Sequence, residues 1–147
     1  MNQEMKRKKI FLIDDDEPEM RIFLFNLLET NDFESVVVES GTVALQRIIE
    51  ENPALIILNI LKYRDSNMLL YRDLKLDEKL KIIPVIMLSN VDQKTFYHCQ
   101  KFKNRPSGQG IPGPEGYLIK PPEADELLQL VCTLTQTSAA DAAEEMA

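Results

Sequence analysis

The chain lacks three features that would place it in a specialised class: many cysteines, a long apolar run and an excess of positive charge. Only Cys99 and Cys132 are present, without the CxxC spacing of a metal site. A chain of 147 residues can bury a core without a disulfide, so we expect free thiols in a reducing cytoplasm. No apolar run approaches the roughly 20 residues of a membrane span. We therefore expect one cytoplasmic domain that does not enter a membrane.

The shortage of positive charge also bears on partners. A formal net charge of -7 argues against nucleic-acid binding, because a phosphate backbone attracts a basic face. The basic cluster from Lys6 to Lys9 is short, and we interpret it as a solvated flank of the first strand. The sequence therefore predicts no nucleic-acid partner.

Apolar runs of strand length alternate with longer segments of helical period, a pattern typical of βαβ units and a parallel sheet. Strands are predicted at Lys9–Ile13, Ser35–Val38, Leu55–Leu58, Val85–Ser89 and Tyr117–Ile119. Helices are predicted at Pro18–Thr30, Thr42–Glu51, Ser66–Lys75, Gln93–Phe102 and Glu123–Thr135. The apolar faces of the first two helices are predicted from Met20, Phe23, Leu24, Leu27 and Leu28, and from Val43, Ala44, Ile48 and Ile49.

These elements predict a single α/β domain over residues 8–135. Residues 1–7 are expected to be a flexible N-terminus, and residues 136–147 a disordered acidic tail of small residues. Asn104–Gly116 holds four of the chain's five glycines and three of its eight prolines, which predicts a loop before the fifth strand.

Polar residues gather where the predicted strands end. They are Asp14 and Asp15 after the first strand, Asn59 after the third, Ser89 at the end of the fourth and Lys120 after the fifth. Ligands of open parallel sheets bind at this edge. Two adjacent carboxylates repel each other by about 4 kcal/mol at ~4 Å in an effective dielectric of about 20, which a lysine or a divalent cation would relieve. Mg²⁺ suits such a site because it accepts carboxylates and phosphate oxygens.

A plainer interpretation stands beside this one. Asp16, Glu17 and Glu19 fit an acidic helix N-terminus, where carboxylates favour the helix dipole and cap free N–H groups. Taken alone, Ser89 fits a helix N-cap and Lys120 fits a surface lysine.

Over roughly Lys8 to Leu134, the chain resembles the receiver domains of two-component response regulators, the CheY-like family. The resemblance is carried by IFLIDDDEPEMR, PALIILN, IPVIMLSN and GYLIKPPEADELL. It implies a doubly wound, five-stranded parallel sheet of the (βα)5, flavodoxin-like kind with strand order 2-1-3-4-5. It also implies Mg²⁺ at the acidic pair and, at the end of the third strand, an aspartate that takes a phosphoryl group from a histidine kinase.

Site roles follow from the resemblance by position. Asp14, Asp15, Asn59 and the backbone carbonyl of Leu61 correspond to the metal ligands. Lys120 corresponds to the phosphate-contacting lysine, Ser89 to the switch hydroxyl and Tyr117 to the switch aromatic, and the Lys120–Pro121 bond is expected to be cis.

Asn59 departs from the family, because it stands where the phosphoacceptor aspartate belongs. A neutral amide is too poor a nucleophile to replace a carboxylate. We therefore predict a single-domain pseudo-receiver that is not an enzyme and binds Mg²⁺ only weakly. It would bind a protein partner, either a histidine kinase or a downstream signalling protein, through the face of helix four, strand five and helix five. The loop LKYRDSN after the third strand has diverged as well, since it lacks the proline and glycine usual there.

Three alternatives stay open. Asn59 could be an engineered substitution in an ordinary receiver, or Asp65 in the following loop could accept the phosphoryl group instead. The third alternative is a phosphatase of the haloacid dehalogenase type, with Asp14 as nucleophile and Asp16 as acid and base. An FMN-binding protein fits less well, because carboxylates after the first strand would repel its phosphate.

Overall fold

The chain forms one sheet of five parallel strands, with the order β2-β1-β3-β4-β5. The computed structural model describes residues 7–14, 17–38, 41–60, 66–95 and 112–135. The strands are β1 Lys8–Ile13, β2 Phe33–Val38, β3 Leu55–Asn59, β4 Val85–Ser89 and β5 Gly116–Ile119. The helices are α1 Pro18–Glu29, α2 Gly41–Glu51, α3 Ser66–Leu76 and α5 Ala124–Thr135. The predicted doubly wound topology is confirmed.

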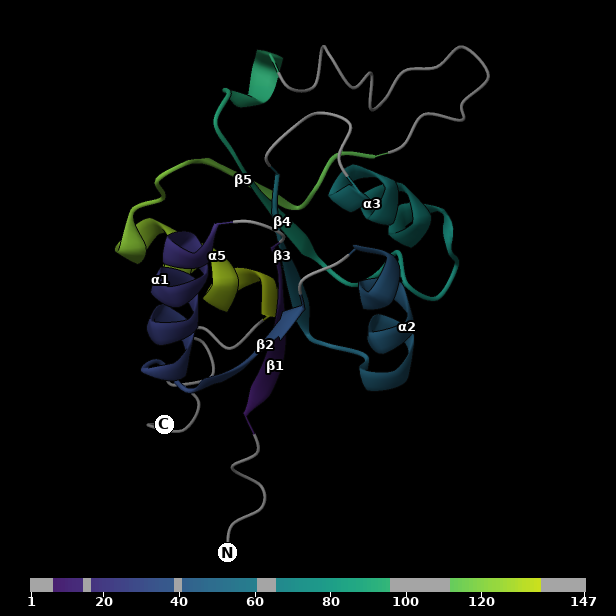
Figure 1. Cartoon of the computed structure of the whole chain (residues 1–147), viewed down its shortest axis with the longest axis horizontal. Coiled ribbons are helices and arrows are strands. Elements are labelled where there is room, and N and C mark those ends of the chain that lie inside the picture. The colour runs from purple at the N-terminus through teal and green to yellow at the C-terminus, as the bar shows by residue number, and fades with distance from the viewer. Residues whose placement is uncertain (1–6, 15–16, 39–40, 61–65, 96–111, 136–147) are drawn as a thin grey trace, which may run out of the picture.

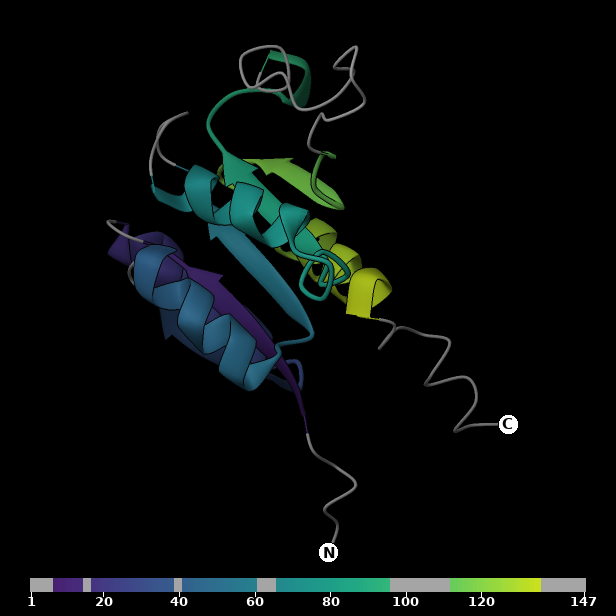
Figure 2. The same ribbon diagram turned by 90° about the vertical axis from the view of Figure 1, so that its right-hand side faces the viewer.

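Helices cover both faces of the sheet. Figure 1 shows α1 and α5 on one face, with α2 and α3 on the other. Figure 2, turned by 90°, shows α2 and α3 in front of the strands. The central strands β3 and β4 are therefore buried at every position, which is why their sequences read as continuous apolar runs.

Alternate residues of β1 serve two separate cores. Ile10 and Leu12 pack with α1 and α5, whereas Phe11 and Ile13 pack with α2 and α3. Fully burying each such side chain stabilises the fold by about 1.5–3 kcal/mol. This two-sided burial holds the ends of β1, β3 and β4 at one edge of the sheet.

The predicted apolar face of α1 is confirmed. Leu24 and Leu28 are buried, and Met20, Phe23 and Leu27 pack partly buried against the same core.

The predicted face of α2 is wrong in two of its four residues. Ala44 and Ile48 are buried, but Val43 and Ile49 are 56% and 55% exposed. At about 100° per residue, Val43 and Ile49 lie roughly 120° to either side of the buried pair, so they flank the core instead of facing it.

Several expectations lie partly or wholly outside the described residues. Residues 93–95 are helical, while the rest of the predicted helix Gln93–Phe102 and most of the loop Asn104–Gly116 are not described. Cys132 is a free thiol whose pKa is raised by burial, and Cys99 is not described. Among the described helices, none is long and apolar enough to cross a membrane. The proposed flexible ends at residues 1–7 and 136–147 stay predictions.

Candidate functional site

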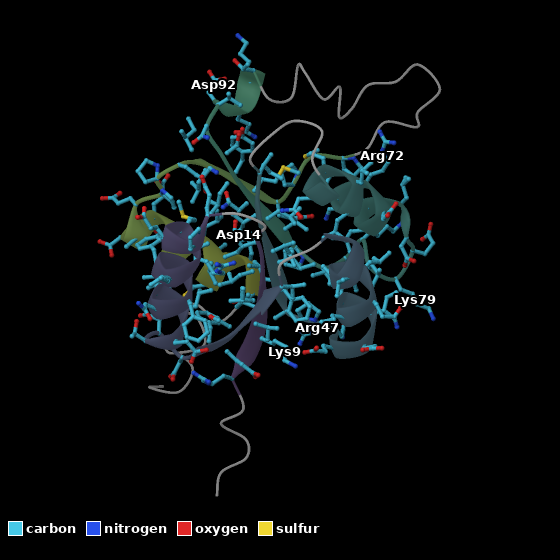
Figure 3. All side chains as sticks on the ribbon, in the orientation of Figure 1. Lys9, Asp14, Arg47, Arg72, Lys79 and Asp92 are labelled. Carbon is cyan, nitrogen blue, oxygen red and sulfur yellow. The ribbon has the colours of Figure 1, made fainter. Side chains whose placement is uncertain are left out.

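Four of the polar residues predicted to converge do lie at the same edge of the sheet. Asp14 follows β1, Asn59 ends β3, Ser89 ends β4 and Lys120 follows β5. Figure 3 shows Asp14 toward the end of the sheet opposite Lys9 and Arg47. Asp14 and Asn59 are each 1% exposed, so the site is buried although it is polar.

Asn59 is the centre of a hydrogen-bond network that joins three strand ends. Its Nδ2 donates to Asp14 Oδ1 at 2.9 Å and to Glu17 Oε1 at 2.8 Å. Its Oδ1 accepts from Lys120 Nζ at 2.7 Å. Only one orientation of the amide satisfies these partners, because carboxylates need N–H donors and an ammonium needs an acceptor. Both ends of the Asn59 side chain are therefore engaged.

Lys120, which follows β5, completes the network on the oxygen end of the Asn59 amide. Its side chain is only 4% exposed, and its Nζ donates to Glu17 Oε1 at 3.0 Å as well as to Asn59. The following Lys120–Pro121 peptide bond is cis, as the resemblance implies. The interpretation of Lys120 as a plain surface lysine is therefore wrong.

Glu17 is the residue that sequence reasoning assigned to the wrong role. As predicted, Glu17 lies at the start of α1, where its backbone carbonyl accepts from the Arg21 N–H at 3.0 Å, but its side chain makes no capping hydrogen bond to α1. Pro18 disfavours helical backbone at the residue before it, and Glu17, with φ -134° and ψ 79°, lies outside the helical region. The Glu-Pro pair was the available signal, because Pro18 at the first helical position marks Glu17 as the residue before the helix, whose carboxylate is left for other partners when it does not cap α1.

The environment of Glu17 favours its charged form. Burial by itself raises the pKa of Glu17, but the hydrogen bonds from Asn59 and Lys120 and the charge of Lys120 outweigh it. The net effect is a pKa below the ordinary value of 4.5. Glu17 is thus an anion at neutral pH.

The described donors fit Mg²⁺ only in part. Asp14 Oδ2 is buried and accepts no hydrogen bond among the described groups, and the Arg21 guanidinium is 3.9 Å away, so this oxygen could serve a cation. Asn59, however, turns N–H groups toward Asp14 and Glu17, so the amide would have to rotate to offer its oxygen to a metal. Asp15 and Leu61, the other proposed ligands, lie outside the described residues. Within the part of the chain that is described, no cluster of three His, Cys, Asp or Glu residues could hold a metal.

Ser89 and Tyr117 hold the segment that follows β4. Ser89 Oγ accepts a hydrogen bond from the backbone N–H of Val91 at 3.3 Å, and the Tyr117 hydroxyl donates to the Val91 carbonyl at 2.7 Å. Both residues predicted to act as switches therefore contact the backbone of the same residue, Val91. The backbone N–H of Lys120 donates to the Ser89 carbonyl at 2.8 Å, which links this segment to the site.

Asn67, in the first turn of α3, supports the site and was not predicted. Its Nδ2 donates to the carbonyl of Asn59 at 3.1 Å and to that of Ile13 at 3.4 Å. It is 1% exposed, so these bonds tie the ends of β1 and β3 to α3 in a buried setting.

Comparisons with known proteins point in one direction. No family model matches the chain. The polar-differentiation response regulator DivK of Brucella ovis is 33% identical over 82 residues, which cover 56% of this chain and 66% of DivK. The signal receiver domain of a signal transduction histidine kinase from Syntrophus aciditrophicus superposes with a TM-score of 0.71 and 25% identity, covering 88% of this chain and 91% of that one. The chain has the fold of CheY-like receiver domains.

Within the CheY-like fold, a third comparison concerns the metal. The receiver domain of a Pseudomonas aeruginosa sensor histidine kinase holds a magnesium ion in its active-site cleft. It superposes with a TM-score of 0.66 at 17% identity, covers 88% of this chain and 98% of its own, and shows a shared fold alone. The matched segment spans just under two thirds of the length of DivK.

Proposed function

We propose that this receiver domain takes up no phosphoryl group at residue 59 and acts in two-component signalling by binding a protein partner. The observation that carries the proposal is the Asn59 amide, whose nitrogen and oxygen are both bound by neighbouring side chains. A neutral amide held in this way lacks the nucleophilic oxygen that phosphoryl transfer needs. The protein would thus be a pseudo-receiver.

The proposed partner surface is the face of β5, α5 and the helical residues 93–95. A groove of about 440 Å³ lies there, bordered by Gln93, Gly116, Tyr117 and Leu130 among others. Tyr117 reaches from this face to the Val91 carbonyl, so a partner that contacts β5 would sense how that segment is held. A histidine kinase or a downstream signalling protein is the class of partner we propose.

We also propose that Mg²⁺ binds weakly. Asp14, Asp15 and the Leu61 carbonyl would hold it, and the Asn59 oxygen would join them only after the amide rotates. When bound, the ion would neutralise the adjacent carboxylates. Loss of the two hydrogen bonds from Asn59 Nδ2 supports the expectation of low affinity.

We propose further that the protein works in the cytoplasm and is not an enzyme. A phosphatase would need Asp14 as an exposed nucleophile, but Asp14 is 1% exposed and its Oδ1 accepts from Asn59. Asp16 and Asp65, invoked by two of the alternatives, lie outside the described residues.

The first prediction concerns covalent labelling. Incubation with acetyl phosphate and Mg²⁺, followed by intact-mass spectrometry, is expected to show no phosphoryl adduct on the wild-type chain, because the amide at residue 59 cannot attack phosphorus. A stable wild-type adduct that disappears in Asp65→Ala would contradict the proposal.

Asn59→Asp is the matched comparison for the same measurement. If this variant is labelled, the rest of the pocket is competent and only the nucleophile is missing. That result would also accommodate an engineered asparagine in an ordinary receiver. Turnover of p-nitrophenyl phosphate lost in Asp14→Asn would instead support the phosphatase.

A further inference from the structure

We propose that the Glu17 carboxylate is a built-in anion that occupies the position where Lys120 and Asn59 would otherwise bind an external oxyanion. In this position Glu17 keeps external phosphate out. This inference rests on the proposed function, since it concerns how a receiver without a phosphoacceptor holds its site in one state. It assigns to Glu17 a contact by which the chain blocks its own site.

Two hydrogen-bond donors converge on the Glu17 carboxylate. Asn59 Nδ2, at 2.8 Å, and Lys120 Nζ, at 3.0 Å, both point to the single oxygen Oε1 of Glu17. One donor comes from the end of β3 and the other from the residue after β5. Two charge-assisted hydrogen bonds to one oxygen form the arrangement in which proteins hold carboxylates and phosphates.

Leaving the Lys120 ammonium without an anion would be costly. Its side chain is 4% exposed, and a buried ammonium is strongly destabilised unless an anion or hydrogen-bond acceptors compensate it. Asn59 Oδ1 supplies an acceptor but no negative charge. Among the described contacts of the Lys120 ammonium, Glu17 is therefore the partner that balances its charge.

Glu17 is the replaceable member of the network. Its side chain is 34% exposed, whereas Asn59 is only 1% exposed and the Lys120 side chain only 4%. A groove of about 560 Å³ lies beside Glu17, bordered by Pro18, Met20, Phe23, Pro121 and Pro122 among others. The carboxylate can turn toward this groove, while the donors that it leaves behind stay in place.

Asp14 limits which anion would enter. Its Oδ1 accepts from the same Asn59 nitrogen, and its charge would repel a second anion. Arg21, with Nη1 at 3.9 Å from Asp14 Oδ2, offsets part of that charge. Inorganic phosphate, with oxygens for both donors, is the probe that fits.

The test compares phosphate binding with Glu17 present and absent. Wild type, Glu17→Ala and Glu17→Gln are titrated with sodium phosphate without Mg²⁺, and the backbone amide resonances of Ser89 and Lys120 are followed by NMR. We expect Glu17→Ala to bind phosphate at least about tenfold more tightly than wild type, because the competing internal anion has gone. Glu17→Gln, which keeps the acceptor oxygen but not the charge, is expected to fall between them.

Glu19→Ala is the matched control, since it removes the same charge from an exposed residue two positions along the chain. Equal phosphate affinities in Glu17→Ala and Glu19→Ala, or wild-type binding as tight as that of Glu17→Ala, would overturn the proposal. Lys120→Met in the Glu17→Ala background is expected to abolish the gain. Non-covalent phosphate affinity tests the role of Glu17, whereas labelling by acetyl phosphate tests the missing phosphoacceptor, so either idea can fail without the other.

Discussion

At the scale of single residues, the choice between an amide and a carboxylate at position 59 decides the chemistry of the site. The Asn59 nitrogen donates to Asp14 and Glu17 at once, and a carboxylate would have no hydrogen for either of them. Asn59 and Glu17 are therefore chemically matched, because the Asn59 N–H groups give a hydrogen bond to each of two neighbouring carboxylates, those of Asp14 and Glu17.

This match predicts that Asn59→Asp destabilises the protein when Mg²⁺ is absent. The change places three carboxylates around Lys120 and Arg21 and removes the N–H donors to Asp14 and Glu17, and an acceptor left unsatisfied in a buried site costs about 1–3 kcal/mol. Urea unfolding in EDTA should show the loss. Added Mg²⁺ should recover more stability in this variant than in wild type, because the ion binds only the folded state.

A double-mutant cycle separates coupling from simple damage. Glu17→Gln should rescue part of the stability lost in Asn59→Asp. Asn67→Asp is the control, and Glu17→Gln should not rescue it, because Asn67 donates to backbone carbonyls and not to Glu17. Strict additivity of Glu17→Gln with Asn59→Asp, or an Asn59→Asp variant as stable as wild type in EDTA, would show that the match does not exist.

At the scale of elements, a buried lysine fastens α3 to the start of β4 and to the segment before β5. Lys75, whose side chain is 2% exposed, donates to both carboxylate oxygens of Glu115 at 3.0 and 2.9 Å. Glu115 Oε1 also accepts from the Val85 backbone N–H at 2.8 Å. Nearby, the Tyr71 hydroxyl donates to the Pro112 carbonyl. These contacts place β5, and with it Tyr117 and Lys120.

The two partners of this ion pair should differ in their effect on stability. Glu115→Ala leaves the Lys75 ammonium buried without its anion and frees the Val85 N–H, so we expect a loss of about 2–4 kcal/mol in urea unfolding. Lys75→Met replaces the charge by an apolar chain of similar length and should cost less. The double variant should resemble Lys75→Met, and a Lys75→Met variant less stable than Glu115→Ala would argue against this account.

At the scale of the whole molecule, ion pairs at the amino-terminal edge of the sheet couple stability to acid. Glu29 accepts from the Ser35 N–H and from Arg7, and these bonds hold its pKa below 4.5. Hydrogen bonds from Lys9 and Arg47 hold the pKa of Glu51 down in the same way. Glu51 contacts Lys9, which Figure 3 labels away from Asp14, and Glu29 contacts Arg7, just before β1 begins.

These shifts predict the direction of the acid response. A carboxyl group with a lower pKa in the folded state stabilises that state above its unfolded pKa, and the contribution disappears as the pH falls through the folded value. The melting temperature should therefore fall below about pH 4.5. The Glu29→Gln/Glu51→Gln variant should show a shallower fall between pH 5 and 3, and an unchanged slope would exclude these residues as the cause.

Much of this architecture could be predicted from local patterns. Apolar runs bounded by turns marked all five strands to within two residues, most clearly β3 and β4, which are buried at every position and so need continuous apolar sequence. The face of α2 could not be predicted as reliably, since Val43 and Ile49 are as apolar as the buried Ala44 and Ile48. The local pattern says that a helix has an apolar side, but the position of the sheet decides how wide that side is.

The sequence by itself determined the doubly wound sheet and the convergence of polar residues, the Asn59 amide among them, at its carboxyl edge. These follow from periodicity and from the rule that parallel strands end at one edge. Only the tertiary structure decided the role of Glu17, which meets Asn59 across 42 residues and Lys120 across 103. Contacts of that separation leave no periodic trace, because they depend on how three strand ends are packed and not on the residues beside them.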